Sequence, residues 1–154
     1  NTKFILAPHE IDKNKINSLR NSINKKSILY SELSYDNINM DLLIIDNVGM
    51  LARLYKYADI AYVGGGMGNS GLHNTLEPAA FGLPIIIGKN YSKFAEAKKM
   101  IELGGMYSIK NNEEFKTLLD SLITNEIESN KIGKINYNFI LENTGATKNI
   151  MNYL

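Results

Sequence analysis

The 154-residue sequence contains no cysteine and no tryptophan, and its charges nearly cancel to a formal net charge of +1 at pH 7. Without cysteine there is neither a disulfide framework nor a thiolate metal site, which indicates a cytosolic protein. No apolar stretch approaches the roughly 18 residues of a membrane span, so we expect the chain itself to be soluble. The 17 basic residues are interspersed with 16 acidic ones, which argues against a nucleic-acid partner.

The residues that are present predict one compact α/β domain over residues 1–154, because 44% of them are hydrophobic. Apolar runs predict strands at 4–7, 27–31, 42–46, 60–63, 85–87 and 106–109. Helical spacing of apolar residues predicts helices at 12–24, 49–57, 74–81 and 92–103, and from 110 to the end. This alternation is typical of a doubly wound, Rossmann-like parallel sheet flanked by helices. Because a strand is already under way near Asn1, we expect a fragment of a longer protein.

Five glycines crowd into eight positions directly after one predicted strand, in the run GGGMGNSGLHNTLEP of residues 64–78. At the carboxyl end of a parallel strand, such bare backbone lets N–H groups approach an anionic ligand. Residues 66–71 match G-x-G-x-x-G, but the next strand ends in Gly88-Lys89 without the acid that would hold a ribose, so a dinucleotide site fits poorly. We favour a ligand-binding loop over the alternative, a tight turn without a ligand.

A second pattern follows the glycines and centres on an acidic residue. Asn74 is the predicted N-cap of a helix, and Glu77 falls in its first turn, where the helix dipole stabilises a carboxylate. Glu77 opens the run EPAAFGLP, a small-residue helix that ends at a glycine and leads into a buried strand. A carboxylate offers only acceptors, so it suits two neighbouring ribose hydroxyls. The alternative interpretation of this pattern is helix capping alone.

The pattern E-P-x-x-x-G-x-P resembles the nucleotide-sugar motif of GT-B glycosyltransferases, whose acid accepts hydrogen bonds from the ribose of the donor. Together with LAPHE and IIDNVGMLARLY, it resembles the carboxyl-terminal half of the 3-deoxy-D-manno-octulosonic acid (Kdo) transferase family over about residues 4–110. The resemblance implies a transferase of lipopolysaccharide biosynthesis that moves Kdo from CMP-Kdo to a lipid A precursor. It also implies no cofactor beyond that donor, and a parent protein at the cytoplasmic face of the bacterial inner membrane.

The same resemblance implies a CMP-Kdo site built from strand-to-helix junctions and the glycine-rich run. Its residues would be Pro8, His9, Val48, Gly49, Met50, Gly65, Gly66, Asn74, Thr75, Leu76 and Glu77. The sequence departs from the family pattern at His9, where an arginine is usual, and at Met50, where an acid is common. In the family, the catalytic base, the acceptor site and the membrane-associating surface belong to the amino-terminal half. We therefore expect no catalytic residue in this chain.

Other polar residues near these segments allow two interpretations each. His73 either contacts the donor or hydrogen-bonds to the glycine-rich run. Lys89, Asn90 and Lys93 follow a strand end and either meet an anionic sugar or are solvated, and we favour solvation. None of the four is assigned to the predicted site.

Two aspartates invite a metal interpretation that the sequence does not support. Asp46 and Asp59 lie on separate segments without a histidine or an acidic cluster at ligand spacing, so no metal is expected. Residues 144–154 resemble the terminal GT-B helix that crosses to the other domain. Two alternative functions remain open: a UDP-sugar-dependent GT-B domain and a non-catalytic nucleotide-binding module.

Overall fold

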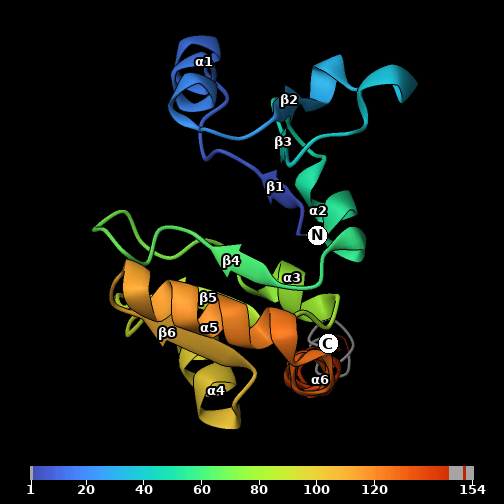
Figure 1. The fold of residues 1–154 in the computed structure, drawn as a ribbon. Helices are drawn as coiled ribbons and strands as arrows, with labels where there is room; N and C mark the ends of the chain where they lie inside the picture. The colour runs from blue at the N-terminus through green and yellow to red at the C-terminus, as the bar shows by residue number, and fades with distance from the viewer. Residues whose placement is uncertain (1, 146–150, 152–154) are drawn as a thin grey trace. The chain divides into compact units, whose positions relative to one another are not determined.

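The computed structural model describes residues 2–145 and residue 151 (Figure 1). Its strands are β1 (Phe4–Leu6), β2 (Ser27–Leu29), β3 (Leu42–Ile44), β4 (Ala61–Val63), β5 (Ile85–Gly88) and β6 (Met106–Ile109). Its α-helices are α1 (Lys13–Ser22), α2 (Leu51–Leu54), α3 (Leu76–Ala80), α4 (Ala95–Leu103), α5 (Asn112–Thr124) and α6 (Glu126–Glu142). Three 3-10 helices complete the list: η1 (Tyr30–Glu32), η2 (Tyr35–Asn37) and η3 (Tyr55–Tyr57).

All six predicted strands and the helices between them are confirmed, with shorter bounds in several cases. The predicted helix at 49–57 is a short α-helix, α2, followed directly by η3, and the helical region after 110 consists of α5 and α6. The terminal helix predicted at 144–154 lies outside the described residues except for Thr144, Gly145 and Met151.

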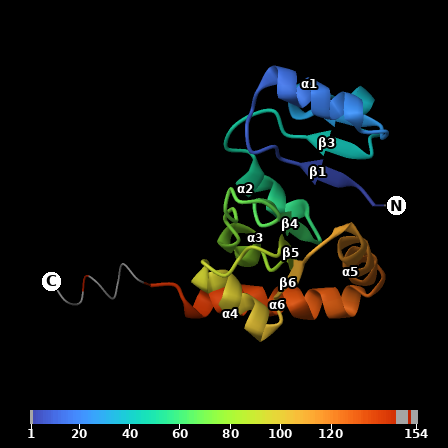
Figure 2. The same cartoon turned by 90° about the vertical axis from the view of Figure 1, so that its left-hand side faces the viewer.

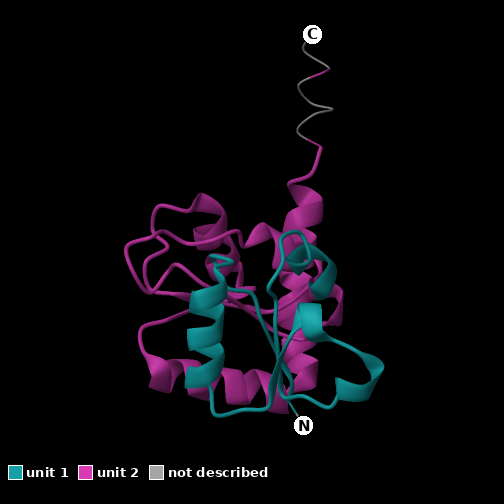
Figure 3. Ribbon diagram, turned by 90° about the horizontal axis from the view of Figure 1, so that it is seen from above, with its two compact units in different colours: residues 1–54 teal, residues 55–154 magenta. Residues whose placement is uncertain are grey.

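The chain divides into two compact units, residues 1–54 and residues 55–154, each built on its own parallel sheet (Figure 3). The strand order is β1-β3-β2 in the first unit and β4-β5-β6 in the second. The α/β class with parallel strands is confirmed, but the strands are grouped in two sheets where the sequence predicted one. Alternating hydrophobic patterns identify strands and helices, and they do not encode which strands are neighbours.

In the first unit, helices cover both faces of the sheet. Ile16 of α1 packs with Leu42 and Ile44 on one face. Leu43, which lies between them on β3, points to the other face of the sheet. There it belongs to a second hydrophobic cluster, against which Leu54 of α2 packs. This division follows from the alternation of side chains along a strand, and it explains why β3 is apolar at every position.

In the second unit, β5 is the central strand and its three isoleucines, Ile85, Ile86 and Ile87, are completely buried. Ile85 and Ile87 belong to the core formed with α3 and α4, whereas Ile86 packs with Leu122 of α5 and Ile132 of α6. Figure 2 shows α6 running along this unit, where it contacts α3, α4 and α5. The long helix therefore braces the small one, α3, that carries part of the predicted site.

Buried Asn136 fastens α6 to the loops that precede β5 and β6. Its side-chain amide Nδ2 donates hydrogen bonds to the carbonyl oxygens of Leu83, at 2.7 Å, and Gly105, at 2.6 Å. One turn earlier, α6 approaches the chain so closely that a Cβ on Gly133 would lie 1.9 Å from the carbonyl oxygen of Gly82. The segment after α3 thus rests directly on the backbone of α6.

We predict that Asn136→Leu destabilises the protein by about 2–4 kcal/mol, because leucine cannot donate and both buried carbonyls lose their partner. Urea unfolding followed by circular dichroism measures the change. Asn138→Leu is the matched control, since Asn138 is exposed on the same helix and its substitution should change stability by less than about 0.5 kcal/mol. Equal unfolding midpoints for the two variants would contradict the assignment of Asn136 as a fastening residue.

Candidate functional site

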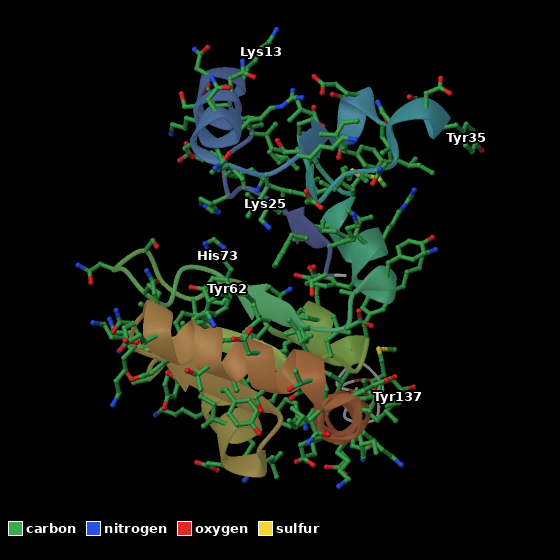
Figure 4. The ribbon with its side chains drawn as sticks, in the orientation of Figure 1. Lys13, Lys25, Tyr35, Tyr62, His73 and Tyr137 are labelled. Carbon is green, nitrogen blue, oxygen red and sulfur yellow. The ribbon has the colours of Figure 1, made fainter. Side chains whose placement is uncertain are left out.

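The segment of residues 64–72 that follows β4, here called the glycine loop, closes on itself. The backbone N–H of His73 donates to the carbonyl oxygen of Gly64 at 3.1 Å. Gly65 has a φ of +87°, and a Cβ there would lie 1.9 Å from the carbonyl oxygen of Gly71. His73 lies beside this crossing (Figure 4), 2.9 Å from the same Cβ position. The backbone of His73 is therefore bonded to the loop, and the role of its side chain stays a prediction.

The other side of the glycine loop lies against the end of β5. A Cβ on Gly88 would come within 2.3 Å of the carbonyl carbon of Gly66. Just beyond, Asn90 donates its backbone N–H to the oxygen of Gly66 at 2.8 Å and its side-chain Nδ2 to the oxygen of Gly68 at 2.9 Å. Asn90, expected to be solvated, therefore has two partners in the chain. Gly65 is required by its positive φ and its contact with Gly71, and a Cβ on Gly66 would be crowded at 3.0 Å from the nitrogen of Gly88. The role of both glycines toward a ligand stays a prediction.

The start of α3 presents a carboxylate held by an amide. α3 begins at Leu76, and the preceding Thr75 has a helical backbone (φ −96°, ψ −15°) and makes no capping hydrogen bond with its side chain. Asn74 nevertheless caps the helix, since its Oδ1 accepts the N–H of Leu76 at 3.0 Å. Its Nδ2 donates to Oε1 of Glu77 at 3.0 Å, so the amide orients the exposed carboxylate.

Thr75 itself is almost fully buried, with 2% of its surface exposed. Its hydroxyl oxygen has no hydrogen-bond partner among the described residues. The side chain of Thr75 is therefore turned into the protein, while Asn74 and Glu77 remain exposed next to it. Buried hydroxyls without a partner are uncommon, which marks this position as a place where a further hydrogen bond is available.

A cavity of about 390 Å³ lies beside this carboxylate, within the second unit. Its lining residues are Asn74, Leu76, Glu77 and Ala80 on the α3 side, with Phe139, Ile140, Asn143 and Thr144 at and after the end of α6. The sequence analysis did not single out the residues of α6, whose spacing indicated only core packing. An apolar wall edged by an acceptor and amides is a common arrangement for binding an organic ring that carries hydroxyl groups.

Tyr55, the first residue of the second unit, lies close enough to Glu77 for the carboxylate to affect the pKa of its phenol. Burial of the phenol raises the pKa of Tyr55, and the negative charge of Glu77 raises it further. The ring of Tyr55 packs against Phe81 with centroids 6.1 Å apart. Tyr55 is thus a half-buried neutral neighbour of Glu77.

The remaining predicted residues belong to the first unit, where Pro8 and His9 line a cavity of about 340 Å³ together with Glu10, Lys15, Ile16 and Leu19. Glu10 and Lys15 form an ion pair at its edge, and the hydrogen bond from Lys15 lowers the pKa of Glu10. The sequence analysis missed this pair, because a charged pair five residues apart at a helix start is common on surfaces.

The junction after β3 combines an exposed tip with a buried anchor. Val48 is 90% exposed, and Gly49 takes a φ of +88° with open space around it. Met50 instead packs against the core cluster of Leu43 and Ile45, so at least part of its role is structural. Among the three residues predicted here, only Val48 and Gly49 are freely presented to a ligand.

The described residues contain no group of three or more histidine, cysteine, aspartate or glutamate side chains placed to hold a metal ion. Asp46 accepts hydrogen bonds from the N–H of Ser31, at 3.0 Å, and from its hydroxyl, which gives this aspartate a structural role. None of the helices in the described ranges is long and apolar enough to cross a bilayer.

The fold matches that of a solved bacterial domain. It superposes on the crystal structure of the C-terminal CMP-Kdo binding domain of WaaA from Acinetobacter baumannii with a TM-score of 0.79, covering 88% of this chain and 72% of that one at 16% identity. The predicted fold class, an α/β fold of parallel strands flanked by helices, is confirmed by this match.

The sequence is similar to those of Kdo transferases from several bacteria. Similarity to the enzyme of Haemophilus influenzae extends over 99% of the chain at 28% identity, and to that of Aquifex aeolicus over 79% at 32% identity. The chain is a homologue of the Kdo transferases. It is also 31% identical, over 98% of its length, to a bifunctional glycosyltransferase/methyltransferase of Fusobacterium nucleatum. No family model matches the chain.

The homology covers only part of each relative. The chain spans 34% of the length of each of the two Kdo transferases and 24% of the bifunctional protein. Activity, substrates and partners of the complete enzymes are therefore considered below as proposals for this chain.

We predict that Gly65→Ala destabilises the second unit by more than about 2 kcal/mol, since it combines a positive φ with a backbone clash. Gly68→Ala, in the same loop, meets open space and should change stability by less than about 0.5 kcal/mol. Thermal unfolding of the two variants measures the difference. Similar melting temperatures for both would show that the crossing of Gly65 with Gly71 does not hold the loop.

Proposed function

We propose that the chain is the donor-binding part of a glycosyltransferase that moves Kdo from CMP-Kdo to a lipid A precursor. The observation that carries the proposal is Glu77, which is exposed at the edge of a cavity and lies in the motif shared with nucleotide-sugar enzymes. Homology to two Kdo transferases supports the choice of donor. We further propose that CMP-Kdo is bound without a cofactor or metal.

In this reaction, the proposed task of Glu77, Asn74 and the glycine loop is to hold the CMP part of the donor. An acceptor hydroxyl attacks the anomeric carbon of Kdo, the bond from that carbon to the phosphate oxygen breaks, and CMP departs with the electron pair. Holding CMP in place makes the attack effectively intramolecular and stabilises the charge that develops on the phosphate. Glu77 would accept hydrogen bonds from the ribose hydroxyls while Asn74 keeps the carboxylate oriented, and backbone N–H groups of the glycine loop would face the phosphate.

The acceptor, the catalytic base and the contact with the membrane are proposed to belong to other parts of a longer protein, at the cytoplasmic face of the inner membrane. This division agrees with the share of the relatives that the chain spans. It also agrees with the acidic residues of the first-unit cavity, where Glu10 is engaged by Lys15 and is poorly suited to act as a base.

We predict that the purified 154-residue chain binds CMP more tightly than UDP or NAD and transfers no Kdo by itself. Calorimetric titration with the three nucleotides separates the proposal from its two rivals. Preference for UDP would favour a UDP-sugar enzyme, and equal weak binding of all three would favour a general nucleotide-binding module. Kdo transfer by the chain alone, followed with CMP-Kdo and a lipid A precursor, would refute the division of labour.

The sharper prediction concerns Glu77→Gln, which keeps the shape of the side chain and removes its charge. Charge-assisted hydrogen bonds from two ribose hydroxyls are worth roughly 1.5–3 kcal/mol, so CMP should bind about ten- to a hundredfold more weakly. The melting temperature should change little, because Glu77 is exposed. Calorimetry gives the affinity and differential scanning fluorimetry gives the stability.

The control ligand for this variant is 2′,3′-dideoxy-CMP, which has no ribose hydroxyls. It should bind equally to the original chain and to Glu77→Gln if the carboxylate acts through those hydroxyls. Leu76→Ala serves as a second control on the same cavity, since it alters the apolar wall and should weaken both nucleotides alike. If Glu77→Gln loses the same affinity for CMP and for 2′,3′-dideoxy-CMP, Glu77 does not bind the ribose.

A further inference from the structure

The glycine loop is held on one side by a single residue that belongs neither to the loop nor to the predicted site. Asn90 follows β5 and lies 22 positions beyond Gly68 in sequence. Its backbone N–H reaches the oxygen of Gly66 at 2.8 Å, and its side-chain Nδ2 reaches the oxygen of Gly68 at 2.9 Å. One residue thus fixes two carbonyl groups that stand two positions apart in the loop.

The contact between Gly88 and Gly66 brings Asn90 within reach of the loop. Gly88 lies against the peptide that joins Gly66 to Met67, with no room for a side chain on Gly88 and only 3.0–3.2 Å between a Cβ on Gly66 and the backbone of Gly88. The geometry needs bare backbone on both sides, and Asn90 then supplies the hydrogen bonds that determine how the peptides are rotated. Without the side-chain bond, the packing of the glycines alone leaves the peptide after Gly68 free to turn.

The direction of these carbonyls determines the direction of the next N–H groups. Across a trans peptide, the C=O and the following N–H point to opposite sides. Since the oxygens of Gly66 and Gly68 point toward Asn90, the N–H groups of Met67 and Asn69 point away from it. The loop therefore presents two backbone donors on the side away from Asn90, and backbone N–H groups are suitable donors to phosphate oxygens.

We propose that Asn90 is a positioning residue, which holds the glycine loop so that the N–H groups of Met67 and Asn69 face the phosphate of the bound nucleotide. This inference rests on the proposed function, because it takes the glycine loop as the phosphate-binding part of the donor site. Asn90 itself touches no ligand. A loop fixed before binding loses little conformational freedom on binding, and affinity falls when that order is lost.

The test compares Asn90→Ala and Asn90→Asp with the original chain, using CMP and cytidine as probes. Asn90→Ala removes the side-chain donor without adding charge. It should lower the affinity for CMP about three- to tenfold and leave the affinity for cytidine, which has no phosphate, unchanged. Asn90→Asp replaces the donor by a carboxylate that repels the carbonyl of Gly68, and should weaken CMP further. Asn130→Asp, an exposed site on α6, is the matched control for the added charge and should bind both probes normally.

A second measurement needs no ligand and separates the two proposals. Amide hydrogen exchange should become faster in Asn90→Ala than in the original chain or in Asn130→Asp at residue 90 and at His73, whose N–H groups donate to the oxygens of Gly66 and Gly64. These bonds open more often when the loop peptides are released. A folded Asn90→Ala variant with unchanged exchange and unchanged CMP affinity would overturn the role of Asn90. An equal loss of affinity for CMP and for cytidine would overturn the role of Asn90 as well. If the original chain binds no CMP while exchange responds to Asn90→Ala, the proposed function fails and the ordering of the loop by Asn90 stands.

Discussion

The close approach of two backbone segments, Gly66 in the glycine loop and Gly88 at the end of β5, is the constraint on which the second unit depends. A side chain on Gly88 would overlap the loop, with its Cβ 2.3 Å from the carbonyl carbon of Gly66, and a Cβ on Gly66 would lie only 3.0 Å from the backbone nitrogen of Gly88. Because β5 is the buried central strand, the contact joins the loop to the most rigid part of the unit. The loop is thereby held at its base, and Asn90 completes the attachment.

A close glycine contact completed by an asparagine amide also occurs before β5, where α6 meets the segment that follows α3. Gly133 and Gly82 approach each other through backbone, and Asn136 adds two buried hydrogen bonds to carbonyl groups. In both places a glycine contact sets the distance and an asparagine amide sets the orientation. The short helix α3, too short to be stable alone, obtains its fixed position from this support, and with it Glu77 obtains a defined place.

The sequence predicts the secondary structure well because strands and helices leave strong hydrophobic patterns, as in the run Ile85-Ile86-Ile87. It also identifies Asn74 and Glu77 as candidate site residues near a helix start, although α3 begins at Leu76 and the predicted helix began at 74. It does not reveal Asn90 or Asn136, because an asparagine in a loop or on a helix carries no local sign of its partners. Asn90 lies 22 positions from its partner Gly68, and Asn136 lies 53 positions from its partner Leu83. Only the fold brings these residues together.

The glycine-rich run shows why a pattern alone leaves its purpose open. Bare backbone is needed wherever two chains pass closely, and equally wherever a chain approaches a phosphate, so the count of glycines fits both interpretations. The structure assigns the first purpose to Gly65 and Gly66, whereas Gly68 meets no atom within 4 Å of a Cβ position. The two purposes support each other physically. A loop that is already locked by its own glycines offers its remaining N–H groups in a fixed direction, and a ligand that meets them does not have to order the chain first.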